Sequence, residues 1–458
     1  MLSPSKQEKM WAVEEFRSGL TEFHGRNRIS LIRAAEQLLQ QAGQSFFRVL
    51  GNTFRQAVAA IFSKQVMNTE KMLEGHVQAT VARCASSSAE KILVAQDTTY
   101  YNYTSHKAME GLGAIQGNIK GCLQHNVLAL DEEGLPLGLL HQQNWTRGGL
   151  DAPKKESEKW FTGLAAVNQQ LAGLGKAVIL MQDREADIFD FFKAERAANV
   201  DLLVRVHQPR KVEVAALNQV FSLQQAAEQL AEQAELQVEV QRNNRTVMLQ
   251  LQVQAGQVAI LPDKDLSPQK HKATDLYLVV AREINAFDEQ GESVFDPQQA
   301  ACWLLLTSYQ VKQAADALQV VKWYALRWRI ERLHLVLKSA GLQVERLQFD
   351  HVHTLLNALA FYSIVAWRIL YLTYLVRQHP ELPPEHCFEQ QEIKLLEAKA
   401  KRPLQNLQQA MIVLGKLVNF QPTKKQPLPG VKILAQALLK LNHMVEAINL
   451  WRDFSLQD

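Results

Sequence analysis

The feature that most constrains the fold is the alternation of short apolar runs with helical periodicity between residues 91 and 206. Residues 177–181 are wholly apolar, as in a strand buried on both faces, and a helical pattern precedes them at residues 154–174. Further strands are expected at residues 91–96, 126–130, 135–141 and 201–206. The turn at 131–134 joins the second and third of these as a hairpin, and a helix is expected up to about residue 198. The order predicts a mixed α/β sheet.

The regions on either side of this sheet have a different character. Residues 1 to about 75 show the periodicity of short helices, and so does the chain beyond about residue 365. Between them, period-two alternation predicts strands near residues 236–240, 249–253, 257–261, 276–280 and 302–307. We therefore expect a helical domain at 1–75, an α/β domain at 76–365 with an antiparallel β insertion at about 212–310, and a helical domain at 366–458.

Composition sets broad limits on function. The chain has 458 residues, enough for two or three domains, and a formal charge of +3, which says little about nucleic acid by itself. The 4 cysteines lie far apart without zinc spacing, so we expect them to be reduced, in a cytosolic protein. The N-terminus carries charges where a signal peptide has an apolar run. The most apolar segment, residues 355–376, is interrupted by Asn357 and Arg368, and we interpret it as a buried helix with no membrane span.

The stretch WYALRWRIERLHLVLK at residues 323–338 predicts one helix with two unlike sides. At about 100° per residue, Tyr324, Arg327, Glu331 and Lys338 share one sector, and apolar residues fill a sector turned away from it. A solvated face with Arg–Glu pairs is the plain interpretation. Against it, tryptophans flank the stripe, and a buried carboxylate beside a guanidinium is costly unless a metal ion or a phosphate uses the charge.

Two predicted strands run into aspartates. Asp97 follows residues 91–96 and Asp183 follows residues 177–182, and the carboxyl ends of strands are where α/β sheets place their chemistry. Either aspartate alone is weak evidence, because Asp commonly begins a turn. With Glu331 they form a ligand set for hard divalent cations, which leave coordination sites for phosphate and water. Two such ions promote phosphodiester displacement.

A basic turn precedes the second helical segment. His24, Arg26 and Arg28 lie about this turn, with Arg33 one turn into the helix. Arginines at a helix start are suited to clamp phosphate, and an ordinary basic surface turn is the alternative.

On these residues the chain resembles bacterial cut-and-paste DDE transposases with a ribonuclease H-like core, of insertion-sequence family four and its Tn-five-type branch. Its most specific element is the spacing Tyr-x2-Arg-x3-Glu-x6-Lys, met by Tyr324, Arg327, Glu331 and Lys338. The DREAD string at residues 183–187 and the Asp-Thr-Thr at residues 97–99 are also typical of the branch. The resemblance covers nearly the whole chain. It implies a ribonuclease H-like mixed-sheet catalytic core with a β insertion, flanked by helical domains.

The resemblance implies roles for the central residues. Asp97, Asp183 and Glu331 would be the catalytic triad and would hold two Mg²⁺ ions, with Mn²⁺ as a substitute. Side chains that would contact DNA are Tyr324, Arg327, Lys338, Trp303 and Arg205. Of these, Trp303 would stack a flipped base during hairpin formation, with a core tryptophan as the alternative.

The resemblance also implies partners and a location. The N-terminal domain, with Arg26, Arg28 and Arg33, would recognise the transposon end, and the C-terminal domain would hold two protomers together. The partners would be double-stranded DNA of the transposon ends and the target, and a second copy of the chain in a synaptic dimer. The protein would work in the bacterial cytoplasm, near the nucleoid.

Other polar residues receive plainer interpretations. A second lysine of the branch is replaced by Leu335, and His125 is either a family-like position or a satisfied core histidine. His334 is expected to pack rather than to bind metal, because Mg²⁺ does not favour imidazole. Glu185 and Asp187 are expected at a helix N-terminus, and Glu110 and Asp190 at the surface.

The predicted function is therefore a DNA transposase, with two alternatives. The first is a structure-selective nuclease on the same core, which would share the carboxylates and would not need Trp303. The second is a catalytically silenced DNA-binding relative. Loss of a triad carboxylate would be its signature, and all three are present.

Overall fold

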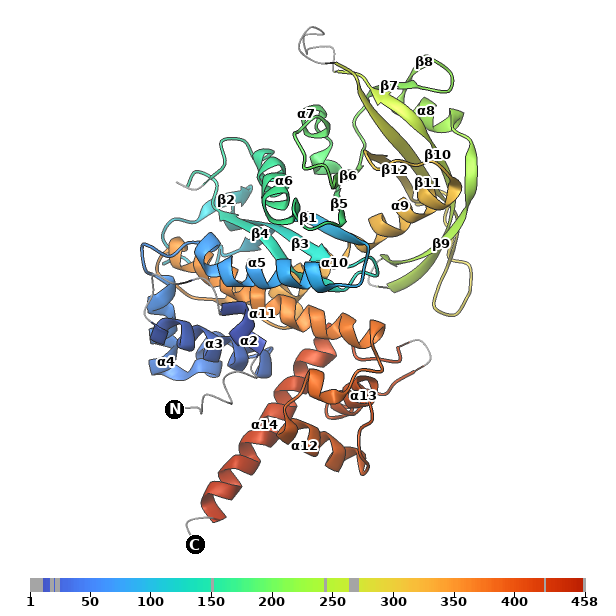
Figure 1. Cartoon of the computed structure of the whole chain (residues 1–458). Helices are drawn as coiled ribbons and strands as arrows, with labels where there is room; N and C mark the ends of the chain where they lie inside the picture. The colour runs from blue at the N-terminus through green and yellow to red at the C-terminus, as the bar shows by residue number, and fades with distance from the viewer. Residues whose placement is uncertain are drawn as a thin grey trace.

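The protein is a mixed α/β structure with helices at both ends of the chain. The computed structural model describes residues 11–16, 20, 25–149, 152–242, 245–262, 272–423 and 426–455. A 12-stranded mixed sheet crosses the upper part of the molecule in Figure 1, and the N-terminal and C-terminal helices lie together below it. The predicted α/β class is therefore confirmed at this level.

The first half of the sheet contains a parallel group and an antiparallel hairpin. Its strands are β1 (Lys91–Asn102), β2 (Gly113–Gln116), β3 (Ile119–Leu130), β4 (Pro136–Trp145), β5 (Ala177–Gln182) and β6 (Val200–Arg205). β1 pairs with β5 and β5 with β6 in parallel, whereas β3 pairs antiparallel with β1 and β4. The wholly apolar β5 lies between two parallel neighbours, as its composition predicts.

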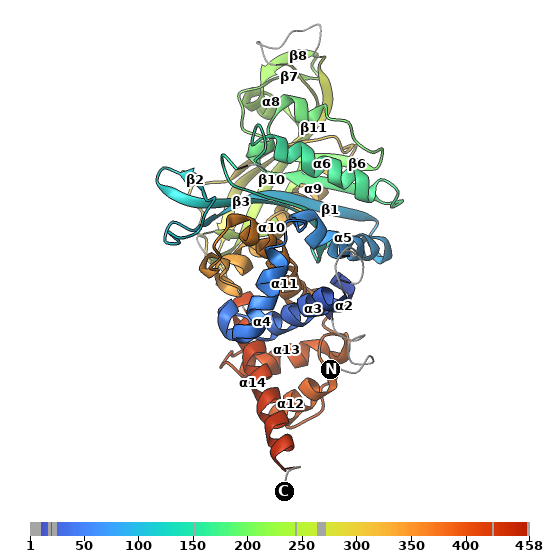
Figure 2. The ribbon, with the colours of Figure 1, turned by 90° about the vertical axis from the view of Figure 1, so that its left-hand side faces the viewer.

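Helices cover both faces of this half-sheet. α6 (Glu158–Leu171) packs on one face, and α5 (Thr69–Ser86) and α11 (Val352–Gln378) pack on the other (Figures 1 and 2). The helix expected up to residue 198 is much shorter, because only Phe189–Phe192 form α7. α11 is long and apolar enough to cross a membrane, but 89% of its most apolar window is buried inside the protein, as in a core helix.

The second half of the sheet consists of the antiparallel strands of residues 211–307. Its elements are β7 (Lys211–Val214), β8 (Gln219–Ser222), α8 (Leu223–Gln229), β9 (Glu232–Arg242), β10 (Arg245–Ile260), β11 (Thr274–Phe287) and β12 (Cys302–Thr307). These strands are antiparallel but form no separate sheet, because β12 pairs with β6 and continues the central sheet. The two strands expected at 249–253 and 257–261 are one strand, β10.

The remaining helices belong to the N-terminal part of the chain and to the part that follows the last strand of the sheet. The N-terminal ones are α2 (Trp11–Phe16), α3 (Gly25–Gln40) and α4 (Phe46–Phe62), and α5 runs across the boundary expected at residue 75. α9 (Ala314–Leu326) and α10 (Arg329–Leu335) lead from the sheet to α11, and α12 (Gln390–Ala400), α13 (Leu407–Lys416) and α14 (Val431–Ser455) complete the chain. The far end of α14 projects from the molecule (Figure 1).

Candidate active site

Asp97 lies on β1, and Asp183 directly follows β5, the parallel neighbour of β1. The β1–β5 register ends with Ala95 opposite Met181, two residues before each aspartate, and the charge of Asp183 acts on Asp97. Residues opposite each other in a sheet point to the same face. The prediction that the first strand ends at Asp97 is wrong, because β1 continues to Asn102 while paired with β3. Asp97 therefore lies where β1 leaves its parallel neighbour.

Glu331 reaches this region from a broken helix. The sequence predicts one helix over residues 323–338, but α9 ends at Leu326, α10 begins at Arg329, and a π-helical turn spans Val336–Ala340. At the break, Arg327 N–H bonds to the Tyr324 carbonyl and Ile330 N–H to the Arg327 carbonyl, which is the tighter three-residue spacing. Glu331 lies in the first turn of α10.

Arg327 lies among the three carboxylates. Its Nη2 donates to Oε1 of Glu331 at 2.8 Å, and its Nη1 is 3.9 Å from Oδ2 of Asp97. Although the side chain is buried, Nε and Nη1 have no hydrogen-bond partner among the described residues. A buried donor without a partner costs free energy, so these N–H groups are placed to bind an anion.

The carboxylates around Arg327 carry more negative charge than its guanidinium balances, which would favour a cation. Burial raises the pKa of Asp97 to about 7; Arg327 opposes this shift, and Asp183 and Glu331 add to it. Burial works to lower the pKa of Arg327, but Tyr324 and the carboxylates of Asp97, Glu331 and Asp183 raise it overall. One guanidinium therefore does not neutralise the three carboxylates.

As the side chains stand, no three His, Cys, Asp or Glu residues within the described part of the chain are grouped to hold a metal ion. Glu331 is engaged by Arg327 instead. The donor chemistry nevertheless fits a hard divalent cation, because carboxylate oxygens are its preferred ligands and the buried Asp97 is short of positive charge.

A cavity of about 790 Å³ opens beside Arg327. Of the residues predicted for the site, Asp183, Glu331, Arg327, Tyr324, Trp303 and Arg205 line it. Trp303 on β12 and Tyr324 on α9 meet edge to face with ring centroids 5.5 Å apart. The cavity therefore has an aromatic wall next to a cationic and carboxylate wall.

Among the lining residues that sequence reasoning missed, three are charged or aromatic. Arg184 and Arg242 line it, and so does Trp328, which is 37% exposed. Arg242 pairs with Glu283 across the second half of the sheet. Arg184 belongs to the DREAD string and Trp328 to the break between helices, so local signals existed for both. Nothing near Arg242 in the sequence indicates its place, which depends on the path of β9.

Lys338 lies near Asp97 but does not line the cavity. Its Nζ is 4.6 Å from the centroid of the Tyr100 ring, on the continuation of β1. Burial lowers the pKa of Lys338, and the carboxylates of Glu345 and Asp97 oppose that shift. Lys338 therefore belongs to the surroundings of Asp97 on the side of Tyr100.

The three N-terminal arginines do not form the expected turn. Arg26, Arg28 and Arg33 all lie within α3, which begins at Gly25, and His24 is outside the described residues. Arg26 and Arg33, seven residues apart, share a side of the helix, whereas Arg28 is about 200° from Arg26. Arg33 stacks over Phe54, 5.3 Å from the ring centroid.

The remaining polar residues have structural partners. His125 is buried, with Nδ1 2.9 Å from Thr98 Oγ1 and Nε2 3.0 Å from Gln96 Oε1, so it is a satisfied core histidine. Asp187 does not serve a helix N-terminus as expected, because it pairs with Arg210 in the interior.

Three other acidic residues lie where solvent reaches them. Glu185 pairs with Lys159, and Glu110 pairs with His351 at the surface. Asp190 is exposed, as the sequence predicts for it and for Glu110.

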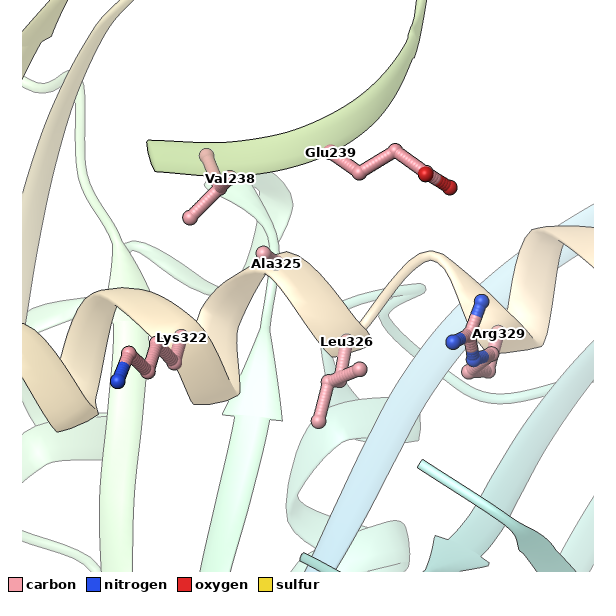
Figure 3. Close-up of a pocket in the computed structure, with 6 residues that line it drawn as sticks. All are labelled: Val238, Glu239, Lys322, Ala325, Leu326 and Arg329. Carbon is pink, nitrogen blue, oxygen red and sulfur yellow. The ribbon is translucent and has the colours of Figure 1, made fainter. Parts of the chain in front are cut away.

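A second cavity, of about 260 Å³, lies on another side of the same helices. Figure 3 shows its six lining side chains between β9 and the junction of α9 with α10. Glu239, Lys322 and Arg329 are its charged residues, and Arg329 also stacks on Tyr374 with 3.9 Å to the ring centroid. It contains none of the predicted site residues, so the larger cavity is the candidate active site.

The chain has a weak likeness to a solved structure. No protein-family model matches the chain. Among solved structures, a piggyBac transposase synaptic complex with hairpin DNA matches it at a TM-score of 0.35 and 10% sequence identity, over 95% of this chain and 83% of that chain. A likeness at this level carries no argument, and the function must be argued from the site.

Proposed function

We propose that this chain is a DNA transposase of the bacterial branch named above. It binds the inverted terminal repeats of its own mobile element, excises the element by nicking, hairpin formation and hairpin resolution, and joins the 3′ ends to target DNA. The observation that carries the proposal is the set of Asp97, Asp183 and Glu331 around Arg327, beside a cavity walled by Trp303 and Tyr324. The strand order from β4 through β3, β1 and β5 to β6 supports the ribonuclease H-like core.

Asp97, Asp183 and Glu331 are the residues that would hold Mg²⁺, as two ions, with Mn²⁺ as a substitute. Bound there, the ions would activate an attacking oxygen and stabilise charge on the leaving one. Glu331 must turn from Arg327 toward the aspartates for this arrangement. That rearrangement frees a third N–H group of Arg327 for a phosphate.

The side chains around the carboxylates suit a distorted DNA end. Arg327 offers unused N–H groups to a phosphate, and Arg205 adds charge to the same cavity. Trp303 and Tyr324 offer aromatic surface to a base that leaves the stack, which hairpin formation requires. Lys338 would contact the strand on the Tyr100 side.

The helical ends supply the remaining parts of the proposal. The N-terminal helices, with Arg26 and Arg33 on one side of α3 and Arg28 on another, would contact the terminal repeat. The C-terminal helices would join two protomers in the synaptic complex. The protein would act on chromosomal DNA in the bacterial cytoplasm.

A cleavage assay tests the proposal. The inverted repeats that flank the reading frame supply the substrate, and the products with Mg²⁺ are separated on a denaturing gel. We expect a hairpin that depends on the divalent ion. Glu331→Gln should lower cleavage by at least about 10³-fold, the scale of losing one member of a catalytic set, while end binding stays close to that of the wild type.

The Trp303→Ala variant separates the transposase from its alternatives. We expect it to nick the end and to accumulate the nicked strand, because the base has lost its platform. If the wild-type protein cleaves DNA without forming a hairpin, and Trp303→Ala cleaves it equally well, the protein is a structure-selective nuclease. Tight binding without cleavage in any divalent ion would indicate a silenced DNA-binding relative.

A further inference from the structure

A chain of buried amide side chains lies between the sheet and α11. Gln124 and Asn126 on β3 and Gln142 and Asn144 on β4 are all buried on this face. Buried amides are costly unless they are hydrogen-bonded, and these are bonded to one another and to α11. The chain ends at His334 of α10, next to Asp97.

Two backbone carbonyls of α11 fix the direction of these bonds. The Ser363 hydroxyl donates its one hydrogen to the Leu359 carbonyl at 2.8 Å, so Gln142 Nε2, 2.8 Å from that hydroxyl oxygen, is the donor. Independently, Asn144 Nδ2 donates to the Leu356 carbonyl at 3.0 Å and to Gln142 Oε1 at 3.1 Å. Both anchors give the Gln142 amide the same orientation, because a carbonyl only accepts.

The orientation of the Gln142 amide fixes the orientation of the Asn126 amide, and that in turn fixes the tautomer of His334. Gln142 Nε2 donates to Asn126 Oδ1 at 2.7 Å, so the Asn126 amide nitrogen lies on the other side, 3.1 Å from Nε2 of His334. An N–H group that faces Nε2 requires Nε2 to be an acceptor. The single ring hydrogen of His334 therefore lies on Nδ1.

Nδ1 of His334 is 3.8 Å from Oδ2 of Asp97. The other oxygen of Asp97, Oδ1, accepts a hydrogen bond from the Thr98 backbone N–H at 2.9 Å. Burial, with the nearby charges of Lys338 and Arg327, lowers the pKa of His334 to about 3, which agrees with a neutral ring.

We propose that the Asn144–Gln142–Asn126 relay sets the tautomer of His334, so that its Nδ1–H orients the Asp97 carboxylate. His334 is then a positioning residue, and Asn126 is the residue that sets its tautomer. At 3.8 Å the contact is longer than a hydrogen bond, so Nδ1–H acts on the Asp97 carboxylate as an electrostatic contact, and polar partners behind metal-binding carboxylates commonly hold them in place. The role of the oriented carboxylate rests on the proposed function, whereas the tautomer itself does not.

The first experiment reads the tautomer in the metal-free protein. Nitrogen-15 NMR of histidine-labelled full-length chain should show a ring with hydrogen on Nδ1 and a bare Nε2, identified by its loss in His334→Gln. Asn126→Asp replaces the donor that faces Nε2 with an acceptor, so Nε2 should gain a hydrogen. A wild-type ring with hydrogen on Nε2, or no change in Asn126→Asp, overturns the relay.

The second experiment measures Mn²⁺ affinity by electron paramagnetic resonance, without DNA. His334→Asn keeps an N–H at the place of Nδ1 and should retain the wild-type affinity. His334→Gln places its amide near the place of Nε2 and should weaken Mn²⁺ binding about 10- to 100-fold, the usual effect of losing an outer partner. His141→Gln is the matched control, since it makes the same change at a histidine of β4 whose Nε2 has no hydrogen-bond partner among the described residues.

The outcomes separate the two proposals. Equal loss of affinity in His334→Asn and His334→Gln would show that the ring only fills space, and retained affinity in His334→Gln would show that Asp97 needs no such donor; either result overturns the positioning role. If the wild-type protein binds no Mn²⁺ while NMR shows the expected tautomer, the metal-dependent function fails and the relay stands.

Discussion

The buried position of Asp97 suits the binding of a cation but lowers the stability of the folded protein. It is one of three carboxylates around a single guanidinium, and burial raises its pKa to about 7 from a usual value near 4. In the folded protein the charged form is therefore disfavoured. The unfolded chain loses the Asp97 proton at lower pH than the folded one, so ionisation of Asp97 opposes folding as the pH rises.

The Asp97→Asn variant should be more stable than the wild type in divalent-free buffer. The difference in unfolding free energy should grow between about pH 4 and pH 7, level off above pH 7, and reach a few kcal/mol, because each unit of pKa shift is worth about 1.4 kcal/mol. Urea unfolding at several pH values measures it.

Glu36 and Glu392, whose pKa burial raises to about 7, occur in both proteins and cancel in this difference. A difference that does not change with pH would contradict the account of Asp97.

At the scale of elements, α6 holds the strand that carries Asp97 from the opposite face of the sheet. Gly163 of α6 lies against Gln96, and a Cβ at this glycine would be 2.3 Å from Gln96 Oε1. The same Oε1 lies 3.0 Å from Nε2 of His125, whose other ring nitrogen contacts Thr98. The contact of Gly163 with Gln96 therefore affects both neighbours of Asp97 in β1, Gln96 directly and Thr98 through His125.

The Gly163→Ala variant should lower stability by about 1–3 kcal/mol, the usual cost of overpacking, and should also slow cleavage. The added methyl group displaces either α6 or the Gln96 amide, and the second disturbs β1 beside Asp97. Urea unfolding and the cleavage assay measure the two effects. Gly173→Ala, just beyond the same helix, is the control, since a Cβ there meets no atom of the described residues within 4 Å.

At the scale of the whole molecule, the end of α14 exposes an apolar surface. Leu450, Trp451 and Phe454 are 71%, 70% and 62% exposed, and the two rings lie 6.3 Å apart. Exposed apolar patches of this kind commonly mark interaction sites. Their place at a projecting helix end, far along the chain from the carboxylates, supports the proposed joining of two protomers (Figure 1).

The Trp451→Glu variant should be folded and bind one DNA end but no longer pair two ends. Light scattering of the protein with end DNA measures this, and circular dichroism checks the fold. Gln436→Glu adds the same charge to an exposed position of the same helix and should pair ends as the wild type does. If the Trp451→Glu variant still pairs two DNA ends, the contact between protomers lies elsewhere in the chain.

Prediction from the sequence was best where the pattern is local. The apolar β5, the hairpin of β3 and β4, and β12 lie where period and turn residues placed them. It failed where tertiary contacts override the local pattern. The single helix over residues 323–338 breaks at Arg327 and Trp328, and β1 runs past Asp97 because β3 still offers hydrogen bonds there.

The sequence by itself determined the residue types of the candidate site and the order of the elements that carry them. The spacing of Tyr324, Arg327 and Glu331 and the aspartates at β1 and β5 were all legible before the fold was known. Only the tertiary structure decided which groups meet. The pairing of β1 with β5 brings Asp97 within electrostatic reach of Asp183, β12 brings Trp303 to Tyr324, and Gln142 of β4 turns the Asn126 amide toward His334. These contacts join segments far apart in the chain, and their geometry depends on strand pairing and packing that no local pattern records.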